Sequence, residues 1–276
     1  MGDTTPPKKE ITGVRESRGK GRSSSIDSWG DIKLTKYDDI KWRLNAKARK
    51  IKKFITKIPQ LDAIFGGGLA VGLNTFLGEG GSGKSLMARE IAKQHKTLYL
   101  CCEVLSDAPD SKEYPNVTAV DYTQYLVKPY KAIAELFTFI EELKPELVVI
   151  DSMTSFFSQS NKALPESDVR EMVWKVHQAC DNKIPIIGIS EVRGQGYNRG
   201  PAGGQGVKHG CSMLVDFRAN TIMSESQINL FDSKLGDIVY QVQVHKDKGG
   251  LATVYPHRLF WTPSKGYVVN KIGGAK

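Results

Sequence analysis

A run of glycines that ends in lysine and serine carries the clearest chemical signal in the sequence. Residues 78 to 85 satisfy the pattern Gly-x4-Gly-Lys-Ser, between an apolar strand candidate (74–77) and a helix candidate (85–95). In that context backbone N–H groups close around phosphates, and the start of the helix adds positive charge. Lys84 would reach the β and γ phosphates, and the Ser85 hydroxyl would ligate Mg²⁺. The residues predicted to hold ATP are Gly78, Glu79, Gly80, Gly81, Ser82, Gly83, Lys84 and Ser85.

The same glycines also fit a dinucleotide-binding pattern. Gly78, Gly80 and Gly83 match Gly-x-Gly-x-x-Gly, and Glu103 follows Gly83 by 20 residues, where such a fold places a ribose-binding carboxylate. The Lys-Ser pair favours the triphosphate site, because a dinucleotide site has no use for that lysine. Asp151 ends the apolar strand candidate 146–150, where a Mg²⁺-binding aspartate belongs. A helix cap or turn residue is the alternative for Asp151 taken alone.

Apolar runs alternate with helical patterns through the middle of the chain. Strand candidates lie at 74–77, 97–101, 117–120, 146–150 and 184–189, with helix candidates at 85–95, 128–143 and 166–180. This alternation predicts an α/β fold with a mostly parallel central sheet and helices on both faces. Short strand candidates at 213–218, 239–245, 253–255 and 267–270 predict an antiparallel C-terminal extension.

The positive charge of the chain is concentrated at its beginning. The 276 residues carry a net charge of +9, and residues 1–57 hold 16 Lys and Arg against 7 Asp and Glu, whereas the remainder holds 23 of each. A polyanion such as nucleic acid is the first partner to consider. A solvated, solubilising tail is the alternative.

Composition divides the chain into three parts. Residues 1–30 are rich in Pro, Gly, Ser and charge and predict a disordered basic tail. Residues 31–57 predict a linker with a basic amphipathic helix over 40–55, and residues 58–276 predict one ATPase domain. No apolar run approaches the length of a membrane span, and the first residues lack a signal core. Four cysteines without zinc spacing complete the expectation of a cytoplasmic or nucleoid-associated protein, or one of an infected cell's cytoplasm, that is not secreted.

Taken together, these segments resemble the RecA/RadA recombinase family, with KaiC-like and DnaB-type ATPases as relatives. The resemblance runs from about residue 54 to residue 248, through 55–69, the glycine loop, Glu103, Asp151-Ser152 and 189–192. It implies a RecA-like P-loop NTPase core in which Glu103 activates water and Asp151 binds Mg²⁺. Glu191 stands at the γ-phosphate sensor, where most recombinases carry glutamine. Its charge would be repelled by phosphate unless magnesium or a lysine intervenes.

The resemblance also implies two loops that face single-stranded DNA. The first falls within 154–167 and the second within 193–206, ahead of the stretch that ends at His209. Aromatic rings would stack on bases while cations hold phosphates; local packing of the rings is the alternative. The residues expected to contact DNA are Phe156, Phe157, Lys162, Arg193, Tyr197 and Arg199.

Lys246 and Lys248 resemble the Lys-x-Lys finger that relatives insert into the ATP site of a neighbouring subunit. Such cations stabilise charge in the transition state. Sites completed across an interface imply a filament or ring, whereas the alternative is a charged hairpin tip.

The function expected from this resemblance is an ATP-dependent recombinase or recombination mediator that binds single-stranded DNA, acts in recombination or repair, and hydrolyses ATP in a DNA-dependent reaction. Two other classes stay open, namely a DnaB-type replicative helicase ring and a KaiC-like regulatory ATPase. The glutamate at position 191 raises a third possibility, a regulatory paralogue that binds ATP but scarcely hydrolyses it.

Overall fold

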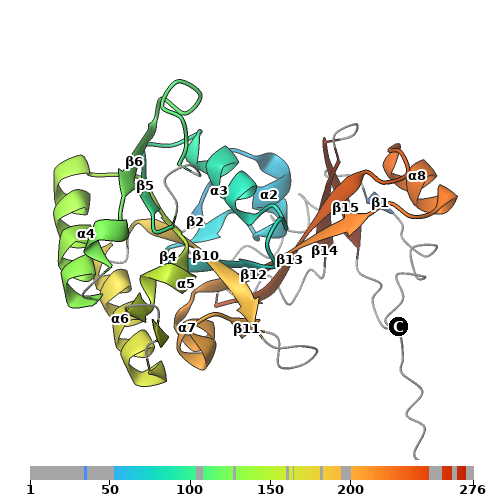
Figure 1. Cartoon of the computed structure of the whole chain (residues 1–276). Helices are drawn as coiled ribbons and strands as arrows, with labels where there is room; N and C mark the ends of the chain where they lie inside the picture. The colour runs from blue at the N-terminus through green and yellow to red at the C-terminus, as the bar shows by residue number, and fades with distance from the viewer. Residues whose placement is uncertain are drawn as a thin grey trace, which may run out of the picture.

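One large mixed sheet organises the chain (Figure 1). The computed structural model describes residues 34–35, 53–103, 108–126, 129–159, 162–163, 165–180, 183–193, 200–248, 257–262 and 266–271. The strands follow the order β1-β15-β14-β13-β12-β4-β10-β7-β5-β6, and β11 (Gly200–Pro201) pairs with β10.

The first half of this sheet is parallel. Its strands are β4 (Gly72–Gly78), β5 (Thr97–Cys101), β6 (Val117–Asp121), β7 (Leu147–Asp151), β10 (Pro185–Arg193) and β12 (Met213–Thr221). The inner strands are buried on both faces and have near-continuous apolar runs such as Leu147–Ile150, so the sequence predicted them within a few residues, whereas the edge strand β6 is mostly exposed. The predicted parallel core is confirmed.

The second half is antiparallel, as predicted. It contains β13 (Ile238–Asp247), β14 (His257–Thr262), β15 (Gly266–Lys271) and β1 (Leu34–Thr35). Figure 1 shows these strands extending away from the helix-covered part, with α8 (Glu225–Phe231) at their far end. A small separate core of Ile222, Phe231, Val239 and Phe260 holds α8 against them.

Helices cover both faces of the parallel strands. On one face lie α2 (Pro59–Ile64) and α3 (Lys84–Ala92), and on the other α4 (Pro129–Leu143), α5 (Met153–Phe156), α6 (Glu166–Ala179) and α7 (Gly204–Gly210). The short elements are η3 (Thr123–Tyr125), the ribbon of β2 (Lys53–Phe54) with β3 (Leu69–Ala70), and the ribbon of β8 (Ser158–Gln159) with β9 (Lys162–Ala163).

Several sequence expectations differ from the structure or fall outside the described residues. The helix predicted over 40–55 is wrong at its end, because Lys53–Phe54 form β2 and pair with β3; residues 36–52 lie outside the described residues. Leu34–Thr35, predicted as linker, pair with β15. The predicted strand 253–255 falls outside the described residues, and β14 was not predicted.

Candidate functional site

Four chemistry-bearing positions lie in one row at the carboxyl edge of the parallel strands. β5, β7, β10 and β4 are consecutive neighbours in the sheet. Asp151 ends β7 and is in register with Cys101 and Ile189, while Glu191 is in register with Gly78. Glu103 follows β5 by two residues. Strand pairing therefore gathers residues that are far apart in the sequence.

The glycine loop needs its glycines for steric reasons. Gly81 and Gly83 have φ of 72° and 88°, in the left-handed region that other residues rarely adopt. A Cβ on Gly78 would lie 2.3 Å from the Ser82 hydroxyl oxygen and 2.6 Å from the Phe217 carbonyl oxygen. The loop is thus a tight backbone turn directly ahead of α3, which begins at Lys84.

Lys84 lies folded over the loop, only 7% exposed. Its Nζ donates hydrogen bonds to the Gly78 and Glu79 carbonyl oxygens at 3.0 and 2.7 Å. Burial lowers the pKa of Lys84, and four carboxylates oppose that shift, Glu191 most strongly and then those of Asp151, Glu103 and Glu79. A cation therefore lies close to the carboxylates of the row. Lys84 could thus offset the repulsion that Glu191 would exert on a bound phosphate.

Asp151 is held by two hydroxyl groups. The Tyr99 hydroxyl donates to Asp151 Oδ2 at 2.6 Å, and the Ser85 side chain is hydrogen-bonded to the same carboxylate. Burial raises the pKa of Asp151, whereas both hydrogen bonds lower it. A carboxylate next to a hydroxyl supplies the hard oxygen ligands that Mg²⁺ takes beside phosphates. Ser85 and Asp151 therefore fit this ion.

Glu103 has an exposed carboxylate whose orientation is set by two serines. Its Oε1 accepts hydrogen bonds from the Ser152 hydroxyl and, at 3.3 Å, from the Ser155 hydroxyl. Ser152 is buried and also caps the start of α5. Sequence reasoning named Ser152 only as part of the Asp151-Ser152 motif and missed Tyr99 and Ser155, for which the one available signal was a place in the strand before Glu103 or shortly after Asp151.

An apolar pocket of about 340 Å³ adjoins the loop between α3 and strands β12 to β14. Leu86 and Glu90 line it from the helix, while Tyr240 and Trp261 line it from the strands with their ring centroids 5.7 Å apart. A Cβ on Gly83 would lie 2.8 Å from the Tyr240 ring, so the pocket begins at the loop itself. The sequence did not predict a role for Tyr240 and Trp261 in a pocket, because it is the pairing of their strands with the rest of the sheet that places them beside α3.

The aromatic residues expected to contact DNA lie in the core instead. Phe156 and Phe157 are 1% and 3% exposed, and Phe156 stacks on Tyr122 with a ring centroid distance of 6.0 Å. This burial contradicts the prediction that either ring stacks on bases; the rings anchor α5 under the sheet. Large apolar side chains such as these are more stable in the core than in water, so Phe156 and Phe157 pack there.

The cationic part of the two expected DNA loops is only partly described. Arg193 is exposed at the end of β10, where it pairs with Gly200. Lys162 lies in β9. Tyr197 and Arg199 fall outside the described residues.

Lys246 and Lys248 lie at the opposite edge of the sheet from the glycine loop. Asp247, between them, is in register with Met213, which is in register with Asn74 near the start of β4. The Lys248 Nζ donates to the Gly210 carbonyl oxygen at 3.3 Å. The Lys246 Nζ donates to the carbonyl oxygens of Lys208, His209 and Cys211 at 2.6, 3.1 and 2.9 Å. Both lysines thus meet the carboxyl end of α7, a favourable place for cations.

Comparison with known proteins finds similarity to ATPases and to DNA repair proteins over part of the chain. A family model described as "ATPase family associated with various cellular activities (AAA)" matches residues 75–192. The DNA repair protein RadA of Aquifex aeolicus (strain VF5) is 28% identical over 154 residues, which are 53% of this chain and 34% of that protein. The DNA repair protein RadA of Chlamydia muridarum (strain MoPn / Nigg) is 26% identical over 182 residues, 63% and 39% of the two chains. The chain therefore spans well under half of the length of these relatives.

A doubly covered parallel sheet with a Gly-x4-Gly-Lys-Ser loop at its carboxyl edge is the arrangement of the P-loop NTPase fold. Within this fold class, the chain is similar to the two RadA proteins over part of its length. Among the described residues, no cluster of His, Cys, Asp and Glu could hold a metal by itself, and no helix has the length and apolarity to cross a membrane.

Proposed function

We propose that this chain is an ATPase stimulated by single-stranded DNA, acting as a RecA/RadA-like recombinase or as a mediator of recombination and repair. One observation carries the proposal: Lys84 is bonded to carbonyl oxygens of the glycine loop, at the edge of the sheet where the strands that carry Glu191, Asp151 and Glu103 end. A phosphate-binding cation beside a row of acidic groups is the arrangement that phosphoryl transfer to water requires.

In the proposed reaction the triphosphate lies in the loop of residues 78–85, with Lys84 on the β and γ phosphates. Ser85 and Asp151 would hold Mg²⁺, which neutralises charge that develops on the phosphates. Glu103, oriented by its serine hydroxyls, would accept a proton from the attacking water. The pocket beside Tyr240 and Trp261 has the size and aromatic lining for a nucleobase.

The position of the finger lysines supports a site shared between subunits. Asp247 is level with Asn74 of β4, so roughly 13 Å of strand separates this level from Gly78, and both lysine side chains are bonded to carbonyl oxygens at the end of α7. Lys246 and Lys248 thus lie too far away to serve their own loop, which leaves a neighbouring copy as the place where they could act. We therefore include a homo-oligomer, either a filament or a ring, in the proposed function.

Single-stranded DNA is the proposed polyanion. The exposed Arg193 beside the second predicted loop, the unmatched positive charge of residues 1–57 and the names of the RadA relatives support it. Because Phe156 and Phe157 are buried, we propose contacts through cations and phosphates. Tyr197 remains the aromatic candidate within the second loop.

The experiment that tests the proposal compares the parent with Lys84→Ala. ATP binding and phosphate release are measured with and without single-stranded DNA. We expect DNA to stimulate the parent and Lys84→Ala to lose both binding and turnover, because no other described cation lies over the loop carbonyls. A Lys84→Ala protein that binds and hydrolyses ATP like the parent would remove the nucleotide site from the proposal.

The alternatives are separated by the DNA arms of the same experiment. Strand displacement on a forked duplex would indicate a DnaB-type helicase. No stimulation together with no DNA retention at low salt would exclude both DNA-dependent functions and leave a KaiC-like regulatory ATPase.

A further inference from the structure

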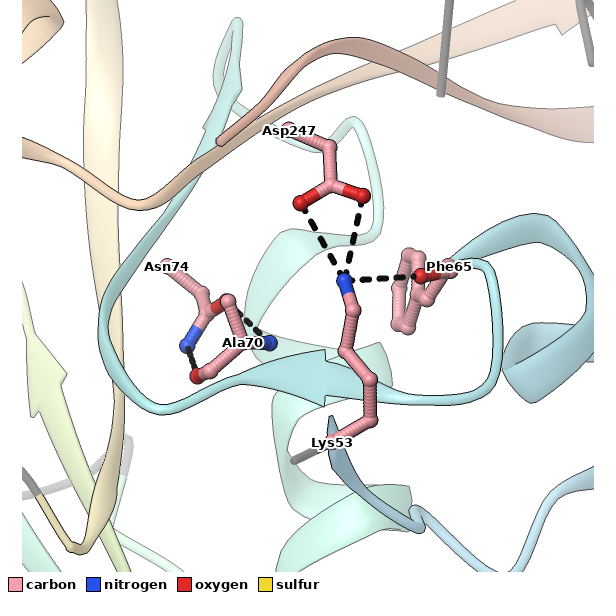
Figure 2. Close-up of polar contacts among 5 residues, drawn as sticks. All are labelled: Lys53, Phe65, Ala70, Asn74 and Asp247. Carbon is pink, nitrogen blue, oxygen red and sulfur yellow. Dashed lines mark hydrogen bonds and ion pairs between the residues drawn. The ribbon is translucent and has the colours of Figure 1, made fainter. Parts of the chain in front are cut away.

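A buried ion pair joins the end of β13 to the ribbon of β2 and β3. The Lys53 Nζ lies 3.1 Å from each carboxylate oxygen of Asp247 and donates to the Phe65 carbonyl oxygen at 3.3 Å (Figure 2). The two side chains are 7% and 0% exposed. A fully buried carboxylate is costly unless it is paired and hydrogen-bonded, so this contact is specific.

The ribbon that carries Lys53 is itself fixed to the sheet. The buried Asn74 side chain accepts from the Ala70 N–H at 3.0 Å and donates to the Ala70 carbonyl oxygen at 2.8 Å, as Figure 2 shows. The same amide donates to the Ile186 carbonyl oxygen of β10 at 3.1 Å. Lys53 therefore lies on a ribbon that is fixed to the sheet, and its ammonium group holds Asp247 in place.

Asp247 lies between the two lysines of the proposed finger. Successive side chains of a strand point to opposite faces, so Asp247 turns toward Phe65 while Lys246 and Lys248 turn toward α7. Lys246 donates to three carbonyl oxygens at the end of α7, whereas the exposed Lys248 donates to one at 3.3 Å. The end of β13 is therefore held by side-chain contacts on both faces of the sheet. Of the two lysines, Lys248 makes fewer hydrogen bonds within its own chain.

We infer that Lys53 and Asp247 are positioning residues, which hold the end of β13 so that Lys248 reaches the ATP site of a neighbouring copy. The inference rests on the proposed function, because it needs a site completed between subunits. Its physical basis is that a cation stabilises transition-state charge only from a set position. The pair ties the last residues of β13 to the segment that carries Phe65.

The test uses the full chain with Asp247→Asn, which keeps the shape of the side chain, and with Lys53→Met. We expect ATP turnover per subunit with single-stranded DNA to fall about tenfold or more, in line with the cost of a misplaced catalytic group. ATP affinity stays within about twofold of the parent, because the glycine loop lies at the other edge of the sheet. The double variant Lys53→Met/Asp247→Asn leaves no unpaired buried charge, and is measured in place of the single variants if these fail to fold.

Asp62→Asn is the matched control. Asp62 is also a carboxylate near this ribbon, accepting from the Thr56 N–H and hydroxyl at 2.8 Å, but among the described residues its hydrogen bonds do not involve β13. Turnover of Asp62→Asn should match that of the parent.

Mixing separates a positioning role from a defect in folding. Lys84→Ala subunits cannot bind ATP but carry an intact β13. Added in excess, they should restore turnover at the intact loop of Asp247→Asn subunits several-fold, as they should for Lys248→Ala subunits.

The outcomes distinguish failure of the positioning role of Lys53 and Asp247 from failure of the shared ATP site on which that role depends. Recovery of Lys248→Ala but not of Asp247→Asn would overturn the positioning role while the shared site stands, as would parental turnover of Asp247→Asn. A Lys248→Ala protein with parental turnover, or one that no mixture recovers, would remove the shared site and the inference with it.

Discussion

Glu103 is the residue best placed to act on water, since its carboxylate stands in the row of strand ends beside Lys84 and accepts from the Ser155 hydroxyl. We predict that Glu103→Gln keeps ATP affinity within about twofold and lowers turnover about 100-fold, because the amide keeps the hydrogen bonds but cannot take a proton. Phosphate release at saturating ATP measures this. The control is Glu141→Gln on the exposed face of α4. Unchanged turnover of Glu103→Gln would favour a regulatory protein that scarcely hydrolyses ATP.

Elements bring the proposed base pocket together, since α3 supplies one wall and β13 with β14 the other. We predict that Trp261→Ala weakens ATP binding about tenfold, by the loss of stacking worth about 1 kcal/mol or more. Calorimetric titration of ATP against inorganic triphosphate checks this, because only the nucleotide should lose affinity. Trp174→Ala is the control, since Trp174 is 58% exposed on α6. Equal loss for both ligands would mean that the substitution disturbs the loop.

The packing of α6 against α7 and β4 makes stability depend on pH. His177 in α6 lies against Gly72, its Nε2 is 3.1 Å from the Gly210 carbonyl oxygen, and burial lowers the pKa of His177 below 6.5, aided by Lys248. Below about pH 6.5 the unfolded chain therefore binds a proton that folded His177 does not, and the free energy of unfolding falls as the pH drops.

Substitution of this histidine tests the argument. His177→Gln should lose less stability than the parent between about pH 7.5 and pH 5.5, measured as the urea midpoint at each pH. His95, whose pKa burial also lowers, keeps part of the dependence in both proteins. An identical pH dependence in the two proteins would show that His177 contributes nothing to it.

At the scale of the whole molecule, the basic segment ahead of β2 is set against a body without net charge. We predict that replacing Lys47, Arg49, Lys50 and Lys52 by Gln weakens binding to single-stranded DNA. The log–log slope against salt should flatten by about 0.7 for each phosphate that the variant no longer neutralises. The variant leaves β1 and Lys53 in place, so the sheet and the ion pair stay intact.

A matched set controls for net charge. Gln at Lys96, Lys112, Lys131 and Lys234, which are exposed on the body, removes the same four charges. It should leave the slope close to that of the parent. A slope that neither set alters would assign the segment to solubility or protein contacts.

Much of the fold of this protein could be predicted from its sequence alone, because the patterns that indicate it are local in the sequence. The glycine loop, the buried strand ending at Asp151 and the alternation of strands with helices are local patterns, set by backbone sterics and apolar periodicity. They predicted the fold class, the loop and the place of Glu103 and Asp151 at strand ends, whereas Glu191 was singled out only by the family resemblance.

Contacts between distant segments were decided only by the tertiary structure. The burial of Phe156 and Phe157, the Tyr240 and Trp261 pocket and the pairing of Lys53 with Asp247 depend on which elements pack together, and no local pattern records this. The sequence by itself determined a Gly-x4-Gly-Lys-Ser loop with acidic groups beside it. The tertiary structure alone decided that Lys246 and Lys248 stand at the opposite edge, because strand register sets where the end of β13 lies relative to β4.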